Sequence, residues 1–141
     1  MKLRRVVVGL MAVLLVVGAA MACGADAATS PTSPTGVSSS FCEAFRQASE
    51  SDLNLTSKAA WDQRLAVTTT LVNLAPAEQQ ANARVYLQLV TDRYQLVSQY
   101  NYVSVQQLPA DVRNQFIATH QSQQDQSNIF IAYAKAACNI G

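Results

Sequence analysis

The sequence contains few residues of the kinds that build metal sites and nucleophilic active sites. Its 141 residues include one histidine, His120, and three cysteines. A single histidine excludes a metal site made of several imidazoles. The five glycines form neither the Gly-x-Ser-x-Gly pattern of a nucleophile elbow nor a glycine-rich phosphate loop. We therefore expect a chain that is not an enzyme and that carries no cofactor.

Charged side chains are also scarce, at 13% of the chain. Beyond the first five positions, seven basic residues stand against nine acidic ones. The arginines among them occur singly, with acids between them: Arg46, Arg64, Arg84, Arg93 and Arg113. Because nucleic-acid binding needs a clustered basic surface, the sequence excludes a nucleic-acid partner. Strand-like alternation is missing too, and the expected fold class is all-α.

Only one long hydrophobic run is present, and it lies near the start. A short basic stretch at residues 2–5 precedes an apolar segment from Val6 to Val17. That segment is shorter than the roughly 20 residues that cross a bilayer as a helix. Small residues follow as far as Ala22, a layout typical of a secretory signal. We expect residues 1–22 to be removed as a signal peptide.

Cys23 stands directly after this segment. The sequence Ala20-Met21-Ala22-Cys23 resembles the lipobox of bacterial lipoproteins, in which the cysteine receives a diacylglycerol and becomes the new N-terminus. The same small residues suit an ordinary signal peptidase, so secretion without a lipid stays open as the alternative. A lipid on Cys23 leaves Cys42 and Cys138 as an even pair, and we expect a disulfide between them.

Residues 23–40 are rich in Thr, Ser and Pro and have little to bury, which predicts a disordered tether. The domain that follows, residues 41–141, shows helical spacing of apolar residues in four segments. These predicted helices cover residues 41–50, 57–74, 76–100 and 109–138. Short connections favour a small antiparallel up-down four-helix bundle. That topology brings Cys42 and Cys138 to the same end of the domain.

The fourth predicted helix has a polar middle on its inward stripe. His120, Gln123 and Ser127 fall where a bundle core is usually apolar, so we take them as candidate ligand-binding residues. The alternative is geometric. A first helix pinned at Cys138 is only roughly 15 Å long, and its cover of the fourth helix ends near residue 128. The polar stretch would then mark the end of that cover.

Aromatic residues give a second set of candidates. Trp61, Tyr86 and Tyr94 lie on predicted helices, and they either pack in the core or line a pocket for an apolar ligand. A lipid or a haem would suit such a pocket, since Tyr and His can ligate haem iron. A hydrolytic enzyme built on His120 and an acid is the least favoured alternative.

The layout as a whole resembles that of small actinobacterial lipoproteins, including mycobacterial ones. The resemblance rests on the lipobox at Cys23, the Thr/Ser/Pro tether, the Phe41-Cys42 opening and the Ala136-Ala137-Cys138 ending. It implies lipid anchoring at the outer face of the cytoplasmic membrane. We expect a cell-envelope interaction or binding module with an envelope protein as partner. A carrier of a small apolar ligand is the alternative.

Overall fold

The computed structural model describes residues 36–52 and 55–140. The predicted signal peptide, Cys23 and most of the predicted tether therefore lie outside the described residues. The described part is all-helical, with five α-helices and two 3₁₀ turns: α1 (Ser39–Ser51), α2 (Lys58–Asn73), η2 (Ala77–Gln79), α3 (Gln80–Ser98), η3 (Val105–Gln107), α4 (Ala110–Thr119) and α5 (Gln121–Cys138). None of these helices is long and apolar enough to cross a bilayer.

The first two helices begin at serine caps. The Ser38 side chain accepts a hydrogen bond from the Phe41 backbone N–H at 3.1 Å, and the Ser57 side chain accepts one from the Ala60 N–H at 3.3 Å. Each bond satisfies a donor that the first helical turn leaves without a partner.

Packing begins before α1. Val37, within the predicted tether, is only 2% exposed and belongs to the core. It precedes the Ser38 cap directly, the position from which an apolar side chain commonly folds back on the first turn of a helix. The domain therefore begins a few residues earlier than the tether composition indicated.

The second and third helices are joined by a tight corner. Pro76 is followed by the 3₁₀ turn η2, and α3 starts only at Gln80. The Gln80 side-chain amide donates to the carbonyls of Val72 and Ala75, at 3.1 and 2.7 Å. These bonds join the start of α3 to backbone oxygens at and just beyond the end of α2.

The fourth predicted helix is in fact two helices. His120, with φ −115° and ψ 16°, ends α4 and precedes α5. The Phe116 carbonyl accepts a hydrogen bond from the His120 backbone N–H. The same carbonyl lies 3.1 Å from the Thr119 hydroxyl and 2.8 Å from the His120 Nδ1 atom. Side chains that compete for helical carbonyls bend or interrupt helices. The prediction of one continuous helix over 109–138 was wrong at this point.

The disulfide between Cys42 and Cys138 is present, with a Cα–Cα distance of 5.3 Å. It joins the first turn of α1 to the last residue of α5 beside the main core. That core is built from small and aromatic side chains of α1, α2, α3 and α5, among them Phe41, Phe45, Leu71, Val90, Phe130 and Ala134. A second, smaller cluster of buried residues contains Trp61, Val97 and Leu108.

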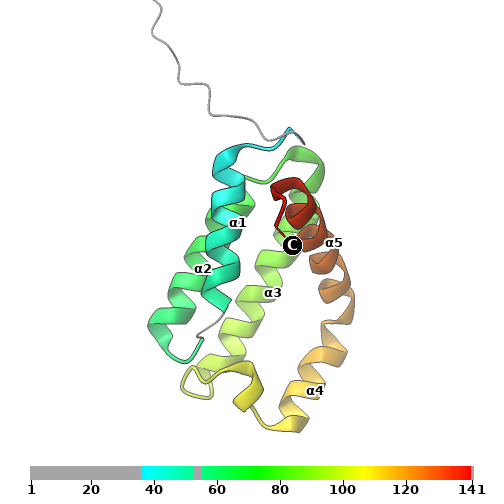
Figure 1. Cartoon of the computed structure of the whole chain (residues 1–141). Helices are drawn as coiled ribbons and strands as arrows, with labels where there is room; N and C mark the ends of the chain where they lie inside the picture. The colour runs from blue at the N-terminus through cyan, green and yellow to red at the C-terminus, as the bar shows by residue number, and fades with distance from the viewer. Residues whose placement is uncertain (1–35, 53–54, 141) are drawn as a thin grey trace, which may run out of the picture.

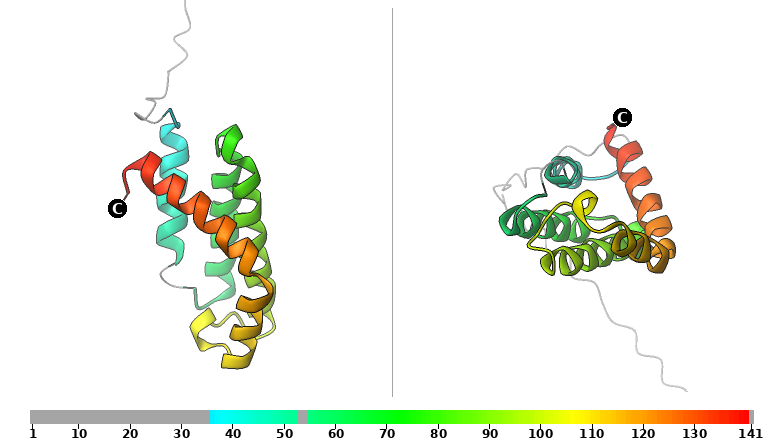
Figure 2. Two further views of the ribbon diagram at one scale, coloured as in Figure 1. Left: turned by 90° about the vertical axis from the view of Figure 1, so that its right-hand side faces the viewer. Right: turned by 90° about the horizontal axis from the view of Figure 1, so that it is seen from below.

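The helices pack against one another except at one corner. Figure 1 shows α1, α2 and α3 running in alternating directions, and Figure 2 shows α5 crossing them obliquely. Helix α4 lies apart at the lower end and fully buries none of its residues. Helix α3, by contrast, buries five of its residues: Ala83, Tyr86, Leu89, Val90 and Val97.

Candidate ligand pocket

A pocket of about 780 Å³ lies where α4 separates from the other helices. It extends from Asp52, just past the end of α1, to the 3₁₀ turn η3 and the start of α5. The pocket begins where α1 ends at Ser51 and lies beside the break between α4 and α5 at His120. Of the three polar residues predicted on the fourth helix, His120 lines this pocket, so the predicted polar site and the observed pocket overlap at one residue.

Eight of the seventeen residues that line the pocket are apolar. They include Leu55, Trp61, Leu89, Leu96, Val105 and Phe116. These residues come from α2, α3, η3, α4 and the segment before α2. Trp61 is 2% exposed, and its indole N–H has no hydrogen-bond acceptor among the described residues. The size and the apolar lining are those of a small-molecule site.

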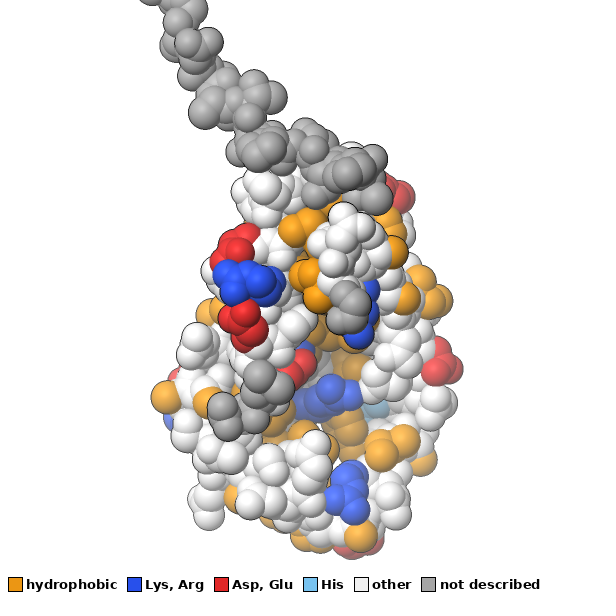
Figure 3. Space-filling view, viewed as in Figure 1, with side chains coloured by type: hydrophobic (Ala, Val, Ile, Leu, Met, Phe, Trp, Pro, Cys, Tyr) orange, Lys and Arg blue, Asp and Glu red, His pale blue; other side chains and the backbone are white. Residues whose placement is uncertain are grey.

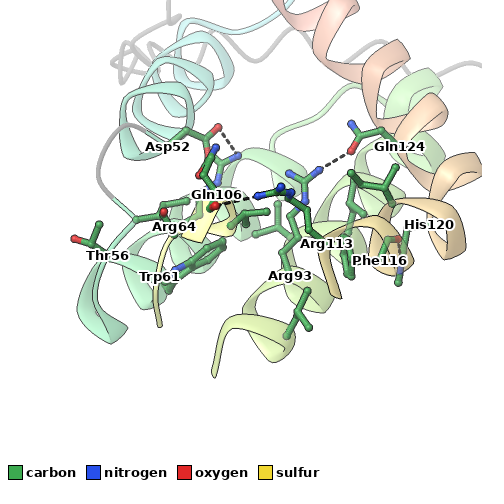
Figure 4. A pocket seen from close by; sticks show the side chains of 17 residues that line it. Asp52, Thr56, Trp61, Arg64, Arg93, Gln106, Arg113, Phe116, His120 and Gln124 are labelled. Carbon is green, nitrogen blue, oxygen red and sulfur yellow. Dashed lines mark hydrogen bonds and ion pairs between the residues drawn. The ribbon is translucent and has the colours of Figure 1, made fainter. Parts of the chain in front are cut away.

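Three arginines reach the same space from three helices: Arg64 from α2, Arg93 from α3 and Arg113 from α4. Figure 4 shows all three side chains extending into the pocket. In Figure 3, basic and apolar side chains and the histidine appear together on the lower half of the face. Asp52 is the acidic residue that lines this pocket in the described part of the chain. The pocket is therefore positively charged.

Arg64 is held by the protein itself. It is only 3% exposed, and it donates to the Ala48 carbonyl, to the Ser51 hydroxyl and to the Tyr86 hydroxyl. Its Nη2 atom also lies 3.0 Å from the Asp52 carboxylate. Burial raises the pKa of the Asp52 carboxyl despite the attraction of Arg64 and Arg93, although 52% of that side chain stays exposed.

Arg93 and Arg113 have weaker partners. The Arg93 guanidinium donates to the Gln124 side-chain oxygen at 2.5 Å, and the Arg113 guanidinium donates to the Gln106 carbonyl at 2.9 Å. Neither arginine forms an ion pair with a residue that the structure describes. Burial lowers the pKa of Arg93, although Asp52 and Tyr86 act in the opposite direction. These two cations keep N–H donors for which the described residues provide no acceptor.

His120 lies at the edge of the pocket and stacks on Phe116, with ring centroids 4.0 Å apart. Its Nε2 atom lies 3.6 Å from the Asp92 carboxylate. Its Nδ1 atom lies 2.8 Å from the Phe116 carbonyl and 2.9 Å from the Thr119 hydroxyl. A carbonyl can only accept, so Nδ1 carries a hydrogen and does not serve as the base for Thr119.

The sequence-predicted site residues divide into two groups. Trp61 and His120 line the pocket, whereas Tyr86, Tyr94, Gln123 and Ser127 do not. Tyr86 packs on Phe130 and bonds Arg64, and Tyr94 donates to Asp62 at 2.9 Å. The buried oxygens of Gln123 and Ser127 have no hydrogen-bond partner in the part of the chain that the structure describes.

Sequence reasoning missed the arginines. Along the chain they occur singly with acids between them, and the fold brings them together although they are 29 and 20 positions apart. A signal existed for two of them. Arg64 follows the buried Trp61 by three residues, and Arg93 follows the buried Leu89 by four, so both fall on inward helix faces. A charged residue on such a face is unusual enough to mark a site.

The described residues contain no group of three His, Cys, Asp or Glu side chains that could hold a metal ion. Haem ligation is not favoured by the geometry either, since Tyr86 and Tyr94 lie away from the pocket and the His120 Nε2 atom faces Asp92. Comparison with protein-family models, curated proteins and solved structures finds no match. The functional argument therefore rests on the pocket.

Proposed function

We propose that this chain is a non-catalytic binding module of the cell envelope that holds a small, largely apolar molecule. The observation that carries the proposal is the pocket of about 780 Å³ between α2, α3, α4 and the start of α5. Its volume falls in the range of about 300 to 1,000 Å³ that small-molecule sites occupy. Of the two roles expected from the sequence, ligand carriage gains this support.

The proposal includes a location and an architecture. Residues 1–22 act as a signal peptide, and Cys23 carries the lipid that anchors the chain at the extracytoplasmic face of the membrane. The Cys42–Cys138 disulfide supports this location, since disulfides persist in oxidising compartments. The bundle itself is an up-down four-helix bundle whose last helix, α4 with α5, is bent at His120.

Ligand binding is testable with Nile red, a neutral apolar dye whose emission increases in apolar surroundings. We expect the mature chain to bind the dye with a change in the emission of Trp61, which lines the pocket and is the one tryptophan of the sequence. Replacing Ile117 in the pocket wall by Asp is expected to weaken binding about fivefold, as expected for the loss of about 1 kcal/mol of apolar contact.

Ile129→Asp is the matched control for this substitution. Ile129 is 55% exposed and Ile117 is 54% exposed, but only Ile117 lines the pocket. The control should therefore bind the dye like the parent chain. Equal weakening by both variants, or no binding by the parent chain, would count against the pocket.

Anchoring is tested at the N-terminus of the mature protein. We expect mass spectrometry of protein from its own host to find a chain that begins at Cys23 and carries a diacylglycerol. Cys23→Ser should move the protein from the membrane fraction to the soluble extracytoplasmic fraction, because no lipid can then be attached. An unmodified Cys23, or a mature chain that begins later, would instead indicate plain secretion.

A further inference from the structure

The pocket combines apolar residues with two cations, Arg93 and Arg113, that form no ion pair with a described residue. Arg64 is paired with Asp52 and bonded to three further oxygens. Arg93 and Arg113 each make one hydrogen bond to an uncharged oxygen among the described residues. Figure 4 shows their guanidinium groups reaching into the pocket from α3 and α4. An anion there would meet donors from two sides.

An unpaired cation in such a place costs stability. Removing a charged group from water is unfavourable unless a counter-charge or enough hydrogen bonds replace the water. Burial lowers the pKa of Arg93, as expected for a cation that is partly removed from water. Arg93 nevertheless stands on the inward face of α3, three residues after the buried Val90 and four before the buried Val97. A group placed at a cost to the free protein is expected to act in a bound state.

The distribution of charge in the rest of the domain also supports a ligand-binding role for these arginines. Beyond the first five residues the chain has more acids than bases, seven basic residues against nine acidic ones. Three of these seven bases line one pocket, with one acid among them. Three other described acids, Glu43, Glu50 and Asp62, form ion pairs at the surface. Positive charge is therefore concentrated where the walls are apolar.

Resting on the proposed function, we infer that the ligand is an anionic amphiphile: an apolar chain that packs between Trp61, Leu89 and Leu96, and a carboxylate or phosphate headgroup bound by Arg93 and Arg113. Planar guanidinium groups match both kinds of headgroup, because each can donate two parallel hydrogen bonds. A free inorganic anion would leave the apolar walls without contact. A neutral apolar molecule would leave both guanidinium groups without a counter-charge.

The test compares four probes with the same ten-carbon chain and different headgroups: decanoate, decyl phosphate, decanol and decyltrimethylammonium. Each displaces Nile red from the mature chain carrying Cys23→Ser, and Trp61 emission provides a second signal. We expect decanoate or decyl phosphate to bind on the order of 10- to 100-fold more tightly than decanol, as charged hydrogen bonds allow. The cationic probe should bind most weakly. Inorganic phosphate at the same concentration should not displace the dye.

Two substitutions assign the effect to residues. Arg93→Gln and Arg113→Gln should each reduce the preference for the anionic probe over decanol by about tenfold, with decanol binding unchanged. Arg84→Gln is the matched control, because Arg84 is an exposed arginine of α3 outside the pocket. Arg93→Gln should also leave the thermal midpoint unchanged or raise it, which shows that the variant is folded.

The outcomes separate the two proposals. If decanol and Nile red bind but the anionic probes bind no more tightly, the pocket is a ligand site and the anionic headgroup is wrong. If the preference for anions persists in both arginine variants, the assignment to Arg93 and Arg113 is wrong. If no probe displaces Nile red, or the dye itself does not bind, the proposed function fails together with this inference.

Discussion

Replacing Cys42 and Cys138 together by serine is expected to lower the free energy of unfolding by up to about 4 to 5 kcal/mol. The disulfide joins residues 96 positions apart, and closing a loop of this length removes much of the conformational entropy of the unfolded chain. A domain of this size has a total stability of about 5 to 15 kcal/mol. The doubly substituted chain should therefore be partly unfolded at physiological temperature.

Urea unfolding followed by circular dichroism measures this loss. All chains carry Cys23→Ser, so that no third thiol takes part in exchange. Reducing agent should shift the unfolding midpoint of the chain with both cysteines to that of the double serine variant, and it should leave the serine variant unchanged. Equal midpoints for oxidised and reduced protein would mean that helix packing alone holds α1 on α5.

Helix identity and the disulfide were predictable because they depend on local signals. The serine at position 57 and the proline at position 76 mark helix boundaries by their own chemistry, and the structure places a cap at Ser57 and a turn after Pro76. The pairing of Cys42 with Cys138 followed from counting thiols. Neither inference depended on how the helices pack against one another.

The break at His120 and the pocket beside it were not predictable from the same signals. No proline or glycine marks the break. It depends on how Thr119 and His120 compete for the Phe116 carbonyl, which periodicity cannot reveal. The pocket takes residues from both sides of this break, Phe116 from α4 and Gln124 from α5, and a prediction of one continuous helix does not show such a corner. The predicted site therefore included polar residues of α5 but neither Arg93 nor Arg113.

The second large effect on stability is expected from replacing Arg64. It contacts α1 through the Ala48 carbonyl and α3 through the Tyr86 hydroxyl, with its own backbone in α2. One buried side chain thus connects three helices beside the pocket. Replacing it by methionine keeps much of the apolar stem but leaves these oxygens without the donors they have in the folded protein. We expect a loss of about 3 kcal/mol in the free energy of unfolding.

Three further variants decide which interaction of Arg64 matters. Arg64→Lys should recover only part of the loss, because an ammonium group is a single point and cannot span the two helices as a planar guanidinium does. Asp52→Asn should cost less than about 1 kcal/mol, since 52% of the Asp52 side chain is exposed and such pairs are screened by water. Tyr86→Phe combined with Arg64→Met should cost less than the sum of the two single changes, because both remove the same bond.

These variants distinguish two explanations for the contribution of Arg64 to stability: its buried hydrogen bonds to Ala48 and Tyr86, or its ion pair with Asp52. If Asp52→Asn destabilises as much as Arg64→Met, the ion pair with Asp52 accounts for the stability, and the contacts with Ala48 and Tyr86 contribute little. If instead the coupling between Arg64 and Tyr86 dominates, the Asp52 carboxylate serves to balance charge rather than to hold the helices together. In that case Asp52→Asn should leave the fold intact and make the pocket more positive. The affinity for decanoate should then rise.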